Sequence, residues 1–79
     1  MNKARRKTLS ELRDRVTEVH DILEEVMNEE ECCRDNMPES LQGSERYEAM
    51  DAACDAMYEA ISQLEEAADN IESAIDQGA

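Results

Sequence analysis

The sequence has little of what a large core, a sheet or a membrane span needs. Its 79 residues include no Trp, no Phe, two Tyr, one Pro and two Gly. No stretch approaches the roughly 18 consecutive apolar residues of a membrane-spanning helix, and no apolar segment resembles a signal peptide. Strand-like alternation of β-branched or aromatic residues with polar ones is also missing. We therefore expect one small all-α domain in the cytoplasm, with no membrane contact.

Cysteine chemistry is equally limited. The three cysteines, Cys32, Cys33 and Cys54, are odd in number, two are adjacent, and none has the spacing of a zinc site. We therefore expect free thiols, no metal site and no cofactor. A chain of fewer than about 80 residues seldom gains more than ~3–5 kcal/mol from its own core, so we expect self-association to supply further stability.

Apolar residues in the first half recur at alternating spacings of three and four, which is the period of a coiled-coil seam. Either Asn2 or Thr8 could cap the start, Thr8 together with Glu11 as a capping box. A helix is expected over about residues 3–35. Its predicted seam consists of Leu9, Leu12, Val16, Val19, Leu23, Val26, Glu30 and Cys33, of which only Glu30 is charged.

The second half repeats this spacing without a charged break. Ser44 is the expected N-cap and Gly78 the expected stop, which places a helix over about residues 44–77. Its predicted seam consists of Tyr47, Met50, Cys54, Met57, Ile61, Leu64, Ala68, Ile71 and Ile75.

A loop over residues 36–43 separates the two helices. Pro38 disfavours a helical residue before it, and Gly43 is expected to take the positive φ of a tight return. Residues 1–79 are then a single antiparallel two-helix coiled-coil hairpin, in which facing residues have numbers that sum to about 80.

Small and apolar residues beside the seam predict a second interface. A column of Ala recurs every seven residues on the second helix, and a face widened in this way lets another helix approach closely. We therefore expect the hairpin to dimerise into a four-helix bundle. The residues expected to mediate this homodimer are Ala53, Ala60, Ala67, Ala74, Ile22 and Met27.

Charge is distributed unevenly along the chain. The formal net charge is −13, from 21 acidic and 8 basic residues. Residues 1–15 hold six basic and two acidic residues, a net of +4, whereas residues 16–79 hold two basic and 19 acidic residues, a net of −17. Such a chain repels phosphate, so direct nucleic-acid binding is not expected. The basic start is expected to lie beside the acidic end of the second helix and to set the antiparallel register.

The acidic surface predicts a basic protein partner, because −13 exceeds the magnitude of about 2–8 that solubility usually requires. One helix with ten acids over residues 45–76 carries a charge per ~5 Å, against one per ~1.7 Å in duplex DNA. Imitation of DNA therefore requires acidic helices side by side. The acidic residues expected to bind the partner are Glu24, Glu25, Glu48, Asp51, Asp55, Glu59, Glu66 and Asp69.

No residue pattern predicts an enzyme. The single histidine, His20, has Asp21 and Glu24 close by, but two ligands on one helix do not make a catalytic metal site. A phosphate-binding glycine loop, a nucleophile elbow and a Ser/His/Asp set are absent from the sequence. The expected activity is binding rather than catalysis.

Two segments carry a resemblance: the basic start MNKARRK at residues 1–7 and RDNMPESLQGSERYE at residues 34–48. With the long acidic helix between them, the chain resembles small acidic helical-hairpin proteins of phages and prophages of Gram-positive bacteria. The resemblance implies a protein that acts by binding a host or phage protein, and such phage proteins include inhibitors of bacterial defence and of nucleic-acid enzymes. Together with the net charge of −17 over residues 16–79, it leads us to expect an inhibitor that occupies a basic, nucleic-acid-binding surface of its target. Two alternatives stay open, namely an assembly module that acts through self-association and a small-ligand sponge with pockets between protomers.

Overall fold

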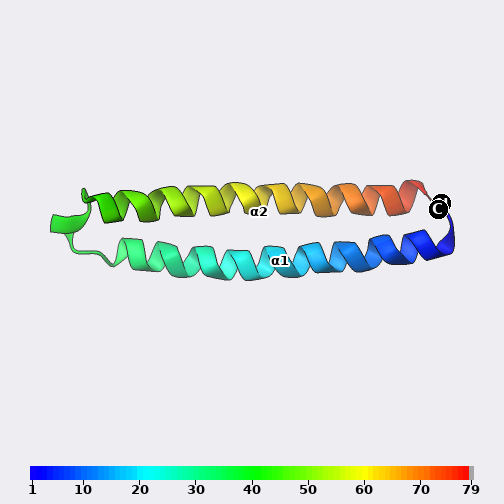
Figure 1. Ribbon diagram of the computed structural model, residues 1–79, viewed down its shortest axis with the longest axis horizontal. Helices are drawn as coiled ribbons and strands as arrows, with labels where there is room; N and C mark the ends of the chain where they lie inside the picture. Colours follow the sequence, from blue (N-terminus) through cyan, green and yellow to red (C-terminus); the bar gives the residue numbers. More distant parts are fainter. Residues whose placement is uncertain (79) are drawn as a thin grey trace.

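Two long helices account for almost the whole chain. The computed structural model describes residues 1–78, in which α1 (Lys3–Asp35) and α2 (Glu45–Gln77) are joined through a short 3₁₀ turn, η1 (Glu39–Leu41). The helices lie antiparallel and side by side over their length (Figure 1). The structure measures 60 × 14 × 13 Å. Residues 1–78 contain no strand, so the all-α, two-helix prediction is confirmed.

Side-chain caps mark where each helix begins. The Oδ1 atom of Asn2 accepts a hydrogen bond from the Arg5 backbone N–H at 2.8 Å, and α1 therefore starts at the earlier of the two expected sites. Thr8 lies inside the helix and donates its hydroxyl proton to the Ala4 carbonyl at 3.1 Å. The Ser44 hydroxyl oxygen accepts from the Tyr47 N–H at 3.3 Å, which confirms Ser44 as the N-cap of α2.

The connection between the helices is built from backbone hydrogen bonds. The Leu41 N–H donates to the Pro38 carbonyl at 2.8 Å, and the Ser44 N–H donates to the Leu41 carbonyl at 3.1 Å. No residue of the described chain has a positive φ, so the expectation for Gly43 is wrong. The return is made over several residues, including η1, and no single position has to adopt the left-handed conformation.

The seam of α2 has the predicted spacing. Cys54 and Ile61 are buried at 3% and 6% exposure. The other predicted seam positions are all partly buried, namely Tyr47, Met50, Met57, Leu64, Ala68, Ile71 and Ile75. The α2 face that packs against α1 is therefore the one the sequence indicates.

The seam of α1 is rotated by one residue from the prediction. Leu12, Val19 and Val26 are 41%, 52% and 46% exposed, and Cys33 is exposed as well. Their places are taken by the residues that follow them. The observed seam of α1 consists of residues that are at least partly buried and that recur at alternating spacings of three and four. They are Arg6, Leu9, Arg13, Val16, His20, Leu23, Met27, Glu30 and Arg34. Leu9, Val16, Leu23 and Glu30 belong to both patterns, and the other half of the predicted seam is wrong.

The connection offers a test that does not disturb the helices. Replacing Gly43→Ala is expected to raise the free energy of unfolding by about 0.4–1 kcal/mol, because it reduces the freedom of the unfolded chain. A Cβ at Gly43 meets no atom within 4 Å, and its φ is not positive. Urea denaturation followed by circular dichroism measures the change.

The matched control is Gly78→Ala. A Cβ there would lie 2.9 Å from Met1 Cε and 3.0 Å from the Ala74 carbonyl oxygen, so this variant should not gain stability. A destabilised Gly43→Ala variant would contradict the described turn.

Candidate protein-interaction surfaces

Three ion pairs connect the helices along one side of the seam, which we call the ion-pair face. Arg13 pairs with Glu72, and His20 Nε2 lies 2.8 Å from Glu65 Oε1. Arg34 Nη1 lies 2.7 Å from Asp51 Oδ1. The residues of α1 are separated by multiples of seven, as are their partners on α2, so each pair occupies equivalent positions in the coiled-coil repeat. The rotated seam of α1 is the arrangement that brings these three cations to α2.

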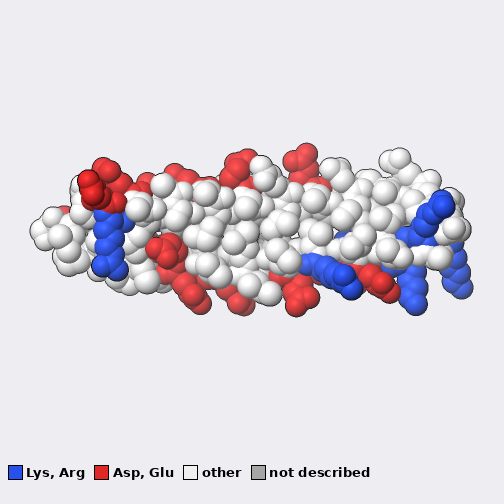
Figure 2. Space-filling view, viewed as in Figure 1, with Lys and Arg blue, Asp and Glu red and all other residues white. Residues whose placement is uncertain are grey.

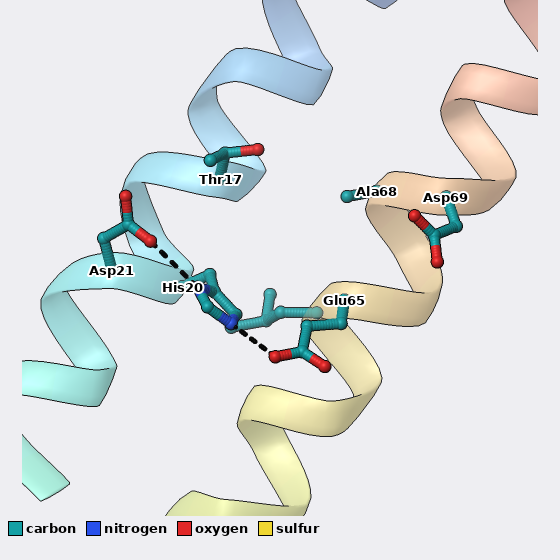
Figure 3. Close-up of a pocket in the computed structure, with 7 residues that line it drawn as sticks. Thr17, His20, Asp21, Glu65, Ala68 and Asp69 are labelled. Carbon is teal, nitrogen blue, oxygen red and sulfur yellow. Dashed lines mark hydrogen bonds and ion pairs between the residues drawn. The ribbon is translucent and has the colours of Figure 1, made fainter.

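His20 is held between both helices on the ion-pair face (Figure 3). Its Nδ1 lies 3.0 Å from Asp21 Oδ1, and its Nε2 faces Glu65 at 2.8 Å and Glu24 at 3.8 Å. A neutral imidazole has one N–H, so both close contacts are hydrogen bonds only when the ring carries two protons. The pKa of His20 is raised, first by the hydrogen bond to Asp21 and then by that to Glu65, while desolvation acts in the opposite direction.

A hollow of about 390 Å³ lies beside this histidine. Its lining residues are Thr17, His20, Asp21, Leu64, Glu65, Ala68 and Asp69. The ligand atoms of His20, Glu24 and Glu65 lie within 4.8 Å of one another, a spacing that a divalent cation could bridge. A doubly protonated imidazole accounts for the same contacts. Because both ring nitrogens are engaged by carboxylates, neither is free to act as a base toward a molecule in the hollow.

The eight acidic residues predicted to bind a partner are all exposed. Two of them also contact cations within the hairpin, since Asp51 pairs with Arg34 and Glu24 lies near His20. The remaining six form no ion pair within residues 1–78: Glu25, Glu48, Asp55, Glu59, Glu66 and Asp69. Acidic side chains line both long edges of the molecule, and basic side chains gather at the end that holds the N-terminus (Figures 1 and 2).

The basic start of α1 contributes less to the register than its charge suggested. The sequence predicted contacts between this segment and the end of α2, and the described residues contain one such ion pair, Arg13 with Glu72. The pairs of His20 and Arg34 lie further along the hairpin. A signal for these pairs was present in the sequence, because residues 13, 20 and 34 and residues 72, 65 and 51 share the same intervals.

Exposed apolar side chains lie on the other side of the seam, which we call the uncharged face; Arg15 and Glu29 of α1 are the two charged residues at its outer edge. Leu12, Val19, Ile22 and Val26 are between 41% and 53% exposed. Each residue of a helix is rotated about 100° from the next, so residues that precede the ion-pair positions of α1 lie across the seam from them. The space-filling view shows uncharged side chains along much of both helices between the acidic edges, with a few charged side chains among them (Figure 2).

The Ala column of α2 lies on the same side as these apolar residues. Ala53, Ala60, Ala67 and Ala74 fall across the seam from the positions of Asp51, Glu65 and Glu72; the first and last are exposed, and the middle two are partly buried. Ile22 is 53% exposed on this face. Met27 is 9% exposed and belongs to the core between α1 and α2, so it is not available to a second interface.

Comparison with known proteins adds no relative. No protein-family model, no curated protein and no solved structure matches this chain significantly. Within residues 1–78, neither helix combines the length and apolarity required to cross a membrane.

The stability contributed by His20 should depend on pH. Its pKa is raised from 6.5 in the folded chain, so the contribution is fully present below pH 6.5 and is lost as the pH rises through the raised pKa. The difference in Tm between the wild type and His20→Gln should therefore shrink from pH 6 to pH 9.

Nuclear magnetic resonance titration of the single histidine measures the pKa directly. Asp21→Asn removes the largest cause of the shift and should move the pKa down toward 6.5. A titration that is identical in wild type and Asp21→Asn would contradict the described contacts.

Proposed function

We propose that this chain is a non-enzymatic protein-binding module that occupies a basic, nucleic-acid-binding surface of a target protein. The observation that supports it is the separation of charge: most of the exposed carboxylates without a cation in the hairpin line its edges, and Glu29 is the exception that lies on the uncharged face. An unpaired surface carboxylate is available to a partner's Lys or Arg at no loss of an internal contact. The resemblance to acidic phage-encoded hairpins favours a target in a bacterial host.

The density of carboxylates supports competition with nucleic acid. All but one of the 21 acidic residues lie on α1 and α2. Each helix of 33 residues is ~50 Å long at a rise of ~1.5 Å per residue, so the hairpin carries a carboxylate about every 2.5 Å. Duplex DNA carries one phosphate per ~1.7 Å. Two antiparallel helices therefore come close to the spacing that a single helix cannot reach.

A second candidate function is an assembly module that acts through self-association. The uncharged face favours it, because four large aliphatic side chains of α1 are 41–53% exposed there.

The binding proposal predicts a strong dependence on salt and on specific carboxylates. Affinity capture from the bacterial host at 50 mM NaCl should retain a protein with a basic surface. The affinity of this protein for the hairpin should fall about tenfold or more at 300 mM NaCl, because the Debye length shortens. Duplex DNA should displace the hairpin from the captured protein. The variant to compare carries Glu48→Gln, Asp55→Asn, Glu59→Gln, Glu66→Gln and Asp69→Asn, and it should no longer capture the protein.

The control removes charge from the other end of the molecule. A chain with Lys3→Gln, Arg5→Gln and Lys7→Gln keeps the acidic edges and should capture the same protein. Partners that are not basic, or whose binding is unchanged by salt and by the carboxylate substitutions, would refute the proposal.

A further inference from the structure

The uncharged face contains a second coiled-coil repeat on α1, next to the seam that packs on α2. Its positions alternate at three and four residues: Leu12, Arg15, Val19, Ile22, Val26, Glu29 and Cys33. All seven are exposed in the hairpin. A repeat of this period is the pattern that packs one helix against another, and α2 already occupies the other seam.

The order of residues in this repeat is complementary to its own reverse. When a second copy lies antiparallel with Ile22 opposite Ile22, Val19 comes opposite Val26 and Leu12 opposite Cys33. In the same register Arg15 comes opposite Glu29, so each apolar residue meets an apolar one and each charge meets its opposite. A parallel copy would instead place Arg15 against Arg15 and Glu29 against Glu29, which is unfavourable.

The neighbouring surface of α2 allows this approach. The equivalent positions of α2 on the uncharged face carry no charge from residue 49 to residue 74, and most of them are Ala. Small residues let helices pack closely, whereas the ion-pair face presents carboxylates along α2. The uncharged face is therefore the side on which two chains of net charge −13 can meet with the least repulsion.

We propose that the uncharged face binds a second copy of this chain, with the α1 helices antiparallel about a twofold axis near Ile22, to give a four-helix bundle. This inference is independent of the acidic-surface proposal, although the bundle would place two acidic hairpins side by side. Because the chains repel each other overall, added salt should strengthen the association. The basic partner proposed for the acidic edges should instead be released by salt, so the two proposals fail separately.

Sedimentation equilibrium over a range of protein concentrations tests the interface. The wild type should show twice the chain mass of 9.0 kDa at high concentration, and NaCl should favour this dimer. Val19→Glu and Ala60→Glu place a carboxylate on the uncharged face and should yield monomers. The matched controls are Asn28→Glu and Ser62→Glu, which add the same charge at exposed helix positions outside that face and should still dimerise.

A charge exchange tests the antiparallel register. Arg15→Glu alone and Glu29→Arg alone should each weaken dimerisation several-fold, and the chain with both changes should recover it. Circular dichroism checks that every variant stays helical. A wild type that is monomeric at all concentrations, or a dimer that Val19→Glu and Ala60→Glu leave unchanged, would overturn the proposal. Failure of the double exchange to recover would overturn the register.

Discussion

The cation–carboxylate contacts that cross from α1 to α2 are formed in one rotation of α1, and the rest of the surface follows from that rotation. Arg13, His20 and Arg34 occupy equivalent seam positions and each reaches a carboxylate of α2. The same rotation buries Met27 and turns Leu12, Val19 and Val26 outward. Surface ion pairs of this kind contribute only about 0–1 kcal/mol each. Full burial of a Val or Leu side chain contributes about 1.5–3 kcal/mol.

That comparison links the rotation to the proposed dimer. In the isolated hairpin Met27 is buried, whereas Leu12, Val19 and Val26 are 41%, 52% and 46% exposed beside the seam. The proposed second copy would bury these side chains without breaking the pairs, because the two sets of residues lie on opposite sides of the seam. The contacts of the ion-pair face connect the two helices of the hairpin, whereas the uncharged face is available to the proposed second copy.

The sequence predicted the fold class, the Ser44 cap and the α2 seam, because each depends on residues close together in the chain. The rotation of α1 could not be predicted in this way. Leu9, Val16, Leu23 and Glu30 belong to both possible seams, and an apolar pattern alone favours Leu12, Val19 and Val26. In the observed rotation, Arg13, His20 and Arg34 contact carboxylates of α2 that are between 17 and 59 residues away in the chain, and a local apolar pattern does not reveal such contacts. The contact of His20 with Glu65 could not be predicted either, since it follows from the rotation.

The three cysteines test this rotation most directly, because they report on both seams without any substitution. We expect N-ethylmaleimide to modify Cys32 and Cys33 rapidly in the folded chain, at a protein concentration low enough to keep it monomeric, since both are exposed. Cys54 should be protected, because it is 3% exposed and burial raises the pKa of its thiol. Mass spectrometry locates the modified residues, and all three should react in urea. If Cys33 is protected together with Cys54, then α1 packs through Leu12, Val19 and Val26, and the described rotation of α1 is contradicted.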